Sequence, residues 1–270
     1  MRASAGNGRY RRAMTQPRTI RRYGWIPDQP DERDHLYAAP PQYLLALPAS
    51  TDLRKQCPPV YDQGNLGSCT ANAIAAAFEF DLAKQALADF MPSRLFIYYN
   101  ERRIEGTVDS DSGAMIRDGI KSVSKQGVCA EDTWPYDIAK FAAEPVGPAY
   151  TQARGHRVLS YQRIPQVLNQ MRGCLAHGYP FVFGFQVYES FESKEVAQTG
   201  VAPLPGTTEQ ALGGHAVLCV GYDDASARFL VRNSWGTGWG MDGYFTLPYT
   251  YLTERNLASD FWAIVKVAAS

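Results

Sequence analysis

The first half of the chain carries a helical pattern of apolar residues. Residues 70–84 hold six alanines and an apolar residue at every fourth position, which predicts a helix with one long apolar stripe. So many alanines indicate a helix that is buried against close neighbours. Two further helices are predicted over residues 92–103 and 114–125, the second ending before a glycine.

The pattern changes to strands after about residue 155. Short apolar runs bounded by Gly, Asp and Ser predict strands over residues 181–185, 216–222 and 228–232. Helices followed by strands indicate an α+β protein with two lobes. A cleft between two such lobes is a common place for a functional site.

Residues 1–50 differ from the rest of the chain in pattern and in charge. The first 22 residues contain seven arginines and no acidic residue, and residues 23–34 are dense in Pro and Asp, which predicts extended chain with turns. The remainder carries 20 basic and 27 acidic residues, a net charge of −7. A basic arm beside an acidic body predicts docking within the chain, with nucleic acid, a membrane surface or a solvated tail as alternatives.

Composition excludes several classes of protein. The chain is 45% hydrophobic and 20% charged, which is typical of a soluble globular protein. No apolar run approaches 18 residues, so we expect no membrane span. Five cysteines are too few for a disulfide scaffold, and the nearby pair Cys174 and His177 lacks companions for zinc. We therefore expect no metal and no cofactor.

The sharpest local motif lies directly ahead of the alanine-rich helix. Residues 63–69 read Gln-Gly-Asn-Leu-Gly-Ser-Cys, which places Cys69 at the N-terminus of that helix. The helix dipole and the unpaired backbone N–H groups there favour a thiolate. A cysteine in this position is more often a small buried apolar residue, so a catalytic role requires a general base elsewhere in the chain.

His215 supplies a candidate base. It follows two glycines and opens the strand predicted over residues 216–222. If residue 222 pairs with residue 228 of the returning strand, residue 217 lies opposite residue 233, and Asn233 falls beside His215. An amide in that place can fix the tautomer and orientation of the imidazole. Each feature alone is more often structural, so the argument depends on their occurrence together.

Three motifs together resemble the papain-like cysteine peptidase family: residues 63–69, Gly214-His215-Ala216, and the Asn-Ser-Trp-Gly-Thr-Gly-Trp-Gly block of residues 233–240. His215 lies 146 residues after Cys69, within the separation of about 130–150 residues that the family shows, and Asn233 lies 164 residues after it. The resemblance covers about residues 52–267. It implies a two-lobed α+β fold, with a helical lobe, an antiparallel β-barrel-like lobe and the active-site cleft between them.

The resemblance also implies a division of the chain. Residues 1–50 would form a pro-like amino-terminal segment, short as in a bacterial type, and residues 51–270 the peptidase domain. Within that domain we expect the helical lobe over about 60–150, the β lobe over about 151–258 and a carboxy-terminal strand over 259–270. The segment would restrain the enzyme until it is moved or cleaved. A structural clamp over the back of the lobes is the alternative.

The activity implied by the resemblance is that of a cysteine endopeptidase. Cys69 would be the nucleophile, His215 the general acid and base, and Asn233 the group that orients His215. Gln63 would donate its side-chain amide to the oxyanion beside the Cys69 backbone N–H. Trp235 would shield the hydrogen bond between His215 and Asn233 from solvent.

Substrate-binding positions follow from the same resemblance. Gly113 falls where the family pairs with the substrate backbone, although a turn at the start of a helix is the alternative. The pocket for the second residue before the cleaved bond would be lined by small, uncharged residues, so we expect it to take bulky apolar side chains and not to select for charge. The expected binding residues are Gly113, Ala114, Met115, Gly184, Gly214, Trp235 and Ser259.

The sequence departs from the family pattern at two positions. Leu66 replaces the first cysteine of the motif, and Thr70 replaces the aromatic residue after the nucleophile. Neither change removes a catalytic group, but the first removes an argument for an oxidising compartment. Disulfide pairing among the other cysteines stays open: Cys57, Cys129, Cys174 and Cys219.

Other functions are compatible with the same residues. An acyl or amide transferase would use the same triad with an amine in place of water, and a silent binding module would keep the fold without turnover. The arginine arm alone does not predict a nucleic-acid binder, because no recognisable binding fold accompanies it. The expected partners are protein or peptide substrates and the chain's own amino-terminal segment. The arginines are followed by no apolar segment of a secretory signal, so we expect a cytoplasmic or non-classically exported protein.

Overall fold

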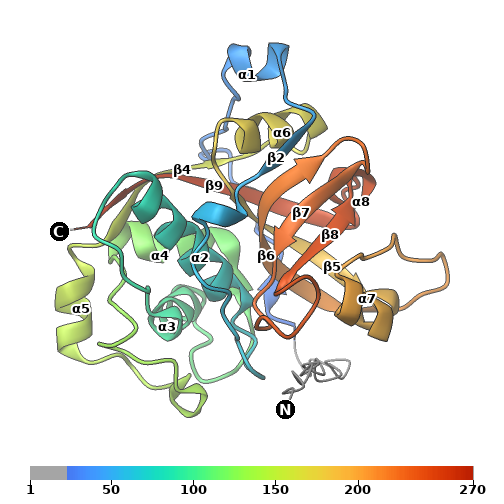
Figure 1. The fold of residues 1–270 in the computed structure, drawn as a ribbon. Coiled ribbons are helices and arrows are strands. Elements are labelled where there is room, and N and C mark those ends of the chain that lie inside the picture. The colour runs from blue at the N-terminus through green and yellow to red at the C-terminus, as the bar shows by residue number, and fades with distance from the viewer. Residues whose placement is uncertain (1–22, 270) are drawn as a thin grey trace, which may run out of the picture.

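The computed structural model describes residues 23–269, and helices and sheet occupy different sides of it (Figure 1). The arginine-rich arm, and with it the predicted docking of its arginines, lies outside the described residues. The helical half is built around α2 (Cys69–Lys84), which is buried along nearly its whole length. Helices α3 (Arg94–Glu105) and α4 (Ile116–Lys125) pack against α2, and α5 (Gly147–Ala153) lies at the edge of this half.

Two of the predicted helices begin later than expected. The second begins at Arg94, because the side chain of Ser93 accepts the backbone N–H of Phe96 at 3.1 Å and caps the helix there. The third begins at Ile116, because the two residues before it form the short strand β3 (Ala114–Met115). The first two residues of the third predicted helix thus pair as a strand with β1, and the helical pattern of apolar residues does not reveal this pairing.

Within the described residues, seven strands form one sheet in the order β4-β9-β5-β6-β7-β8, with β2 paired to β6. Every pair in this sheet is antiparallel. The long central strands place the residue after His215 directly above α2. The strands are β2 (Ser50–Asp52), β4 (Arg157–Arg163), β5 (Phe181–Tyr188), β6 (Ala211–Asp223), β7 (Arg228–Arg232), β8 (Tyr244–Pro248) and β9 (Ala258–Ala268).

Short helices complete the fold around the sheet. The α-helices are α1 (Pro41–Leu45), α6 (Leu168–Ala176), α7 (Lys194–Thr199) and α8 (Tyr249–Thr253), and single turns of 3₁₀-helix lie at Arg54–Gln56, Ile138–Lys140 and Glu189–Glu192. Figure 1 shows α1 and α6 together at one end of the sheet and α7 at the other.

The pairing of β6 with β7 contains a bulge that the sequence did not predict. Tyr222 pairs with Phe229 rather than with Arg228, so the predicted register is wrong by one residue at the turn. The register shifts again between Cys219 and Gly221, and Leu218 then lies opposite Arg232. The bulge cancels the first error, so this register continued by one residue places residue 217 opposite residue 233, and Asn233 lies beside His215.

The amino-terminal segment runs through the centre of the molecule. Its strand β1 (Trp25–Ile26) pairs in parallel with β3 and contacts β5 and β6, so it lies between the helical half and the sheet (Figure 1). Farther along, the backbone of Tyr37 donates to the carbonyl of Arg163 at 2.8 Å. The described part of the segment, residues 23–50, is therefore part of the fold.

The structure confirms the predicted α+β class with a helical half and an antiparallel sheet. Among residues 23–269, no helix is both long and apolar enough to span a bilayer.

Candidate active site

Cys69 is the first residue of α2 and is completely buried. Its Sγ accepts a hydrogen bond from the backbone N–H of Ala216 at 3.3 Å. Since Ala216 directly follows His215 on β6, this bond joins the start of the helix to the histidine strand. The structure thus brings together the cysteine and the histidine that lie 146 residues apart in the sequence.

His215 is held by the two residues that the sequence associated with it. Its Nε2 lies 2.9 Å from Oδ1 of Asn233, and that oxygen also accepts the backbone N–H of Ser234 at 2.9 Å. Because the Ser234 N–H can only donate, the oxygen assignment is fixed and Nε2 of His215 must carry a proton. The ring of Trp235 stacks on the imidazole, with centroids 5.0 Å apart and planes at 25°. The neutral tautomer therefore has its basic nitrogen at Nδ1.

Gln63 is buried in the loop ahead of α2 and is fixed at both ends of its amide. Oε1 accepts the hydroxyl of Ser234 at 2.6 Å, and Nε2 donates to the carbonyl of Leu66 at 2.9 Å. The Gln63 backbone N–H also donates to the Ser234 carbonyl at 2.9 Å. The loop that carries Gln63 is thereby tied to the loop that carries Asn233 and Trp235.

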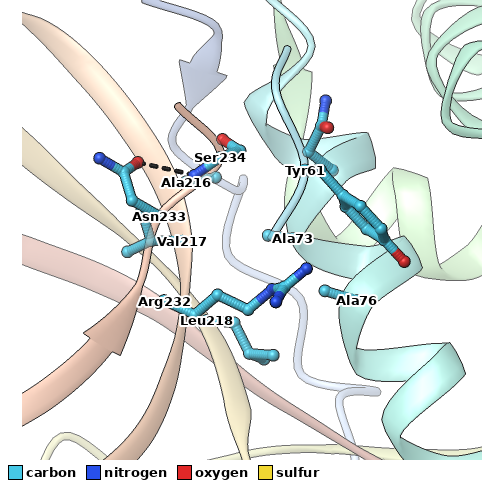
Figure 2. A pocket seen from close by; sticks show the side chains of 10 residues that line it. Tyr61, Ala73, Ala76, Ala216, Val217, Leu218, Arg232, Asn233 and Ser234 are labelled. Carbon is cyan, nitrogen blue, oxygen red and sulfur yellow. Dashed lines mark hydrogen bonds between the residues drawn. The ribbon is translucent and has the colours of Figure 1, made fainter. Parts of the chain in front are cut away.

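The space behind Asn233 is filled by the side chain of Arg232. Figure 2 shows it extending between the sheet and α2 toward the ring of Tyr61, beside the dashed bond from Ser234 to Asn233. Its guanidinium donates to the carbonyls of Pro58 at 2.5 Å and Pro59 at 2.6 Å. The cavity among these side chains measures only about 10 Å³. Arg232, the residue before Asn233, therefore anchors the loop of Pro58 and Pro59 that leads to Gln63.

The two departures from the family pattern have structural explanations. Thr70 turns its hydroxyl inward and donates to Oε1 of Glu101 on α3 at 2.6 Å. Glu101 is completely buried, and burial raises the pKa of its carboxyl well above the usual range, which favours the neutral acid. Leu66 is 2% exposed and packs in the core. Both replacements are thus well accommodated by their surroundings.

Residues Tyr23 to Trp25 cover this site. The carbonyl of Gly24 accepts the backbone N–H of Ala114 at 2.8 Å, and a Cβ on Gly24 would lie 1.7 Å from the carbonyl oxygen of Gly67. The ring of Tyr23 meets that of His215 edge-on at a centroid distance of 5.9 Å, and its hydroxyl donates to Glu192. The segment therefore lies directly over the histidine and the loop before the cysteine.

Burial raises the pKa of the Cys69 thiol to about 12, although backbone hydrogen bonds from Ala216, Gly24 and Thr70 oppose the shift. At neutral pH the sulfur of the covered site is therefore a thiol. A thiol is a poor nucleophile compared with a thiolate.

The structure gathers most of the expected binding residues around Trp25 and its neighbours. Ala114 pairs with Trp25, and Met115 pairs with Ile26. The indole lies against Gly184 and Gly214. Gly113 approaches Gly24, but its backbone N–H donates to the Tyr98 hydroxyl at 3.2 Å, so Ala114 provides the N–H that meets the segment. Ser259 pairs with Gly184 in the sheet.

Sequence reasoning missed a carboxylate in the lining of this pocket. Asp260 follows Ser259, and its Oδ2 accepts the indole N–H of Trp25 at 3.2 Å. The expectation of a lining without acidic or basic groups is therefore incomplete. The signal was present in the sequence as the residue after Ser259, but strand alternation alone would point it away from the pocket. A left-handed backbone at Asp260, with φ of +59°, turns it inward.

The cysteines and the candidate zinc pair show no further chemistry. All five cysteines, which lie within the described residues, are free thiols. Nδ1 of His177 lies 3.0 Å from the hydroxyl of Tyr37. No group of three or more metal-ligating side chains occurs among residues 23–269.

The chain is similar in sequence to known cysteine proteases. A model of the papain family of cysteine proteases matches residues 47–260. An uncharacterized peptidase C1-like protein of Acanthamoeba polyphaga mimivirus is 44% identical over 272 residues, covering 92% of this chain and 88% of the viral protein. The thiol protease aleurain of Arabidopsis thaliana is 29% identical, over 75% of this chain and 56% of its own length.

Two solved structures illustrate the similarity of the fold. Xylellain, a cysteine protease from Xylella fastidiosa, has a TM-score of 0.84 and 45% identity, with 92% of this chain and 96% of xylellain covered. Digestive procathepsin L 3 of the Tenebrio molitor larval midgut has a TM-score of 0.67 at 21% identity, over 82% of this chain and 71% of its own. The second likeness concerns the fold alone.

Proposed function

The chain belongs to the papain family of cysteine proteases and is a peptide hydrolase acting on proteins or peptides, and on that premise we propose that Cys69, His215 and Asn233 are its catalytic triad. The observation that carries the proposal is the convergence of these residues at one point. The sulfur of Cys69 accepts a hydrogen bond from the backbone N–H of β6 that follows His215. The amide oxygen of Asn233 is hydrogen-bonded to Nε2 of the imidazole. In this proposal residues 51–270 form the peptidase domain and residues 1–50 the restraining segment.

The mechanism follows from these positions. Nδ1 of His215 takes the Cys69 proton, and the thiolate attacks the peptide carbonyl carbon. The resulting imidazolium protonates the leaving amine, which leaves an acyl-enzyme with a thioester bond. Water then attacks the thioester, giving its proton to His215, and the acid product leaves with the thiol restored. Asn233 keeps the ring in place throughout, because its amide oxygen accepts a hydrogen bond from the Nε2–H group of His215.

The oxyanion that forms in each attack needs hydrogen-bond donors. Cys69 opens α2, so its backbone N–H has no partner within the helix. Gln63 has two N–H bonds on its amide, one of which is used by Leu66. We assign the second to the oxyanion. Trp235 packs over the imidazole and keeps water from the bond between His215 and Asn233.

The amino-terminal segment restrains the enzyme in this proposal. It lies over the histidine and the loop before Cys69, and it fills the pocket beside the sulfur with the Trp25 ring. Gly24 and Gly67 are so close that any side chain on Gly24 would collide with the Gly67 carbonyl. The expected binding residues Gly113, Ala114, Met115, Gly184, Gly214, Trp235 and Ser259 would meet substrate when the segment leaves.

The test uses alkylation of Cys69 by an epoxide inhibitor of cysteine peptidases, followed by intact mass and peptide mapping. Cys69→Ala should abolish both labelling and peptide hydrolysis while the protein stays folded. In the full chain, Gly24→Ala should accelerate labelling several-fold, because the new methyl displaces the segment. Leu36→Ala is the matched control, since Leu36 is an exposed apolar residue of the same segment.

Two results would contradict the proposal. Hydrolysis that survives Cys69→Ala would show that another residue is the nucleophile. Equal labelling rates for Gly24→Ala, Leu36→Ala and wild type would show that the segment is a clamp and not a restraint. A point substitution is preferable to trimming the chain near residue 49, because the segment's contacts with Arg163 and the sheet are part of the fold.

A further inference from the structure

Trp25 occupies a pocket whose walls are formed largely by backbone. A Cβ on Gly184 would lie 1.9 Å from the indole ring, and one on Gly214 would lie 2.6 Å from it. A larger residue at either position would exclude the ring. Trp25 is 6% exposed in this setting. The pocket is therefore shaped for a flat side chain of two fused rings.

Asp260 supplies the polar end of this pocket. Its Oδ2 accepts two hydrogen bonds, from the indole N–H of Trp25 at 3.2 Å and from the backbone N–H of Asp28 at 2.8 Å. Its Oδ1 accepts a bond from Arg163 at 2.9 Å. Both donors to Oδ2 belong to the amino-terminal segment, whereas Arg163 lies on β4. When the segment leaves, Oδ2 loses both donors and faces an empty pocket.

The surrounding charges decide which side chain suits that oxygen. Arg117 and Arg163 both donate to Oδ2 of Asp34, at 2.7 and 3.1 Å. Asp34 and Asp28 leave with the segment, while the two arginines stay on the body. Arg163 already pairs with Asp260 through Oδ1, so a cationic side chain would compete with a guanidinium for this carboxylate. A neutral side chain with an N–H donor has no such penalty, and it satisfies the buried acceptor.

We propose that Asp260 is a specificity-determining residue that selects tryptophan at the second position before the cleaved bond. This inference rests on the proposed peptidase function, because it concerns the pocket beside the same nucleophile. In it, Trp25 is the chain's own mimic of the preferred substrate side chain. The carboxylate adds a hydrogen bond that an apolar pocket of the same shape would lack, so selection depends on the indole N–H as well as on ring size.

The experiment uses full-length protein carrying Trp25→Ala, which removes the side chain that fills the pocket and so lets a peptide substrate displace the segment. Four peptide substrates differ only at the second position before the cleaved bond, which is tryptophan, 2-naphthylalanine, phenylalanine or arginine. Naphthylalanine has the size of tryptophan and lacks its N–H. We expect kcat/KM to be about fivefold or more higher for tryptophan than for naphthylalanine, and lowest for arginine.

A second variant tests the role of the carboxylate. Asp260→Asn tolerates the left-handed backbone and presents an N–H₂ group where an oxygen accepted the indole. In the Trp25→Ala protein it should bring the ratio of kcat/KM for tryptophan to kcat/KM for naphthylalanine close to one. Because both substrates are compared on the same variant, a loss of activity common to both cancels from this ratio.

The outcomes separate this inference from the proposed function. Hydrolysis that depends on Cys69 but runs equally fast with tryptophan and naphthylalanine would overturn the role of Asp260 and leave the peptidase intact. A preference for arginine would overturn the charge argument. Absence of any Cys69-dependent hydrolysis would contradict the peptidase itself. Alkylation of Cys69 offers a second measurement: Trp25→Phe should accelerate it in an otherwise wild-type chain and should have little further effect when Asp260→Asn is present.

Discussion

The amide oxygen of Asn233 lies 2.9 Å from Nε2 of His215 and is itself held by the backbone N–H of Ser234. This second bond fixes the orientation of the Asn233 amide, because the backbone N–H of Ser234 can only donate and must therefore face the amide oxygen. The imidazole therefore meets an acceptor whichever protonation state it adopts. In the proposed mechanism His215 takes the Cys69 proton, so the ring becomes an imidazolium and this hydrogen bond becomes charge-assisted and stronger.

Replacing Asn233 tests this positioning role. A hydrogen bond to a charged group contributes about 1.5–3 kcal/mol, so Asn233→Ala should lower kcat about ten- to a hundredfold with a smaller change in KM. Asn233→Asp is the matched control, because it keeps an oxygen at the same place and should lose less activity. It should also move the alkaline limit of the pH–rate profile upward, since a carboxylate stabilises the imidazolium. Equal losses in both variants, with unshifted profiles, would indicate a merely structural residue.

Replacing Gln63 tests the assignment of the oxyanion donor. Removal of one such donor typically lowers the rate on the order of 10²–10³, so Gln63→Ala should reduce kcat by that factor and leave KM nearly unchanged. Ser234→Ala removes the hydroxyl that holds the Gln63 amide and should give a smaller loss of the same kind. An effect confined to KM would contradict the role given to Gln63.

The sequence predicted which residues come together better than how they do so. Local motifs indicated Cys69, His215 and Asn233, because Cys69 lies at the start of a helix and His215 follows two glycines, and the structure brings the three residues together. The register that joins the last two was predicted correctly only at its end. A one-residue error at the turn was cancelled by a bulge near Gly221. A bulge inserts an unpaired residue without changing composition, so no pattern of apolar and polar positions reveals it.

The contacts of the amino-terminal segment could not be derived from local pattern. The sequence predicted extended chain with turns over residues 23–34, and the structure places Tyr23 and Trp25 of this stretch against His215 and the glycines of the sheet. What placed them there is a parallel pairing with residues 114–115, a stretch that the helical pattern assigned to a helix. The inward carboxylate of Asp260 depends on a left-handed backbone, which a non-glycine residue adopts only in a particular tertiary setting.

The hydroxyl of Tyr23 provides a test of how firmly the segment is held. It donates to Glu192, and burial and this bond raise the pKa of the phenol above its usual range. Tyr23→Phe removes the bond and keeps the ring against His215. A hydrogen bond contributes about 0.5–1.5 kcal/mol to stability, so the rate of Cys69 alkylation should rise about two- to tenfold. Glu192→Gln should act in the same direction, because it weakens the acceptor. An unchanged or slower rate in both variants would show that the bond does not hold the segment.

The carboxyl of Asp81, near the end of α2, predicts how stability changes with pH. It is buried, neither oxygen has a hydrogen-bond partner among the described residues, and burial raises its pKa to about 8 against weak opposition from Lys84. The folded protein therefore keeps a proton there between about pH 4 and pH 8, where the unfolded chain has lost it. The stability contributed by the neutral carboxyl is complete below about pH 4 and is lost as the pH rises toward 8.

Asp81→Asn removes that titration, and the measurement is urea unfolding at several pH values in a Cys69→Ala background, which prevents self-cleavage. Relative to its parent, the variant should gain up to about 1.4 kcal/mol of unfolding free energy for each pH unit between about 4 and 8, and the difference should level off above that range. Any constant cost of burying the amide shifts the whole curve and leaves this slope unchanged. Asp132→Asn, at an exposed position, is the matched control and should follow the parent at every pH. Parallel curves for Asp81→Asn and the parent would show that Asp81 is ionised in the fold, and would require a partner for its charge.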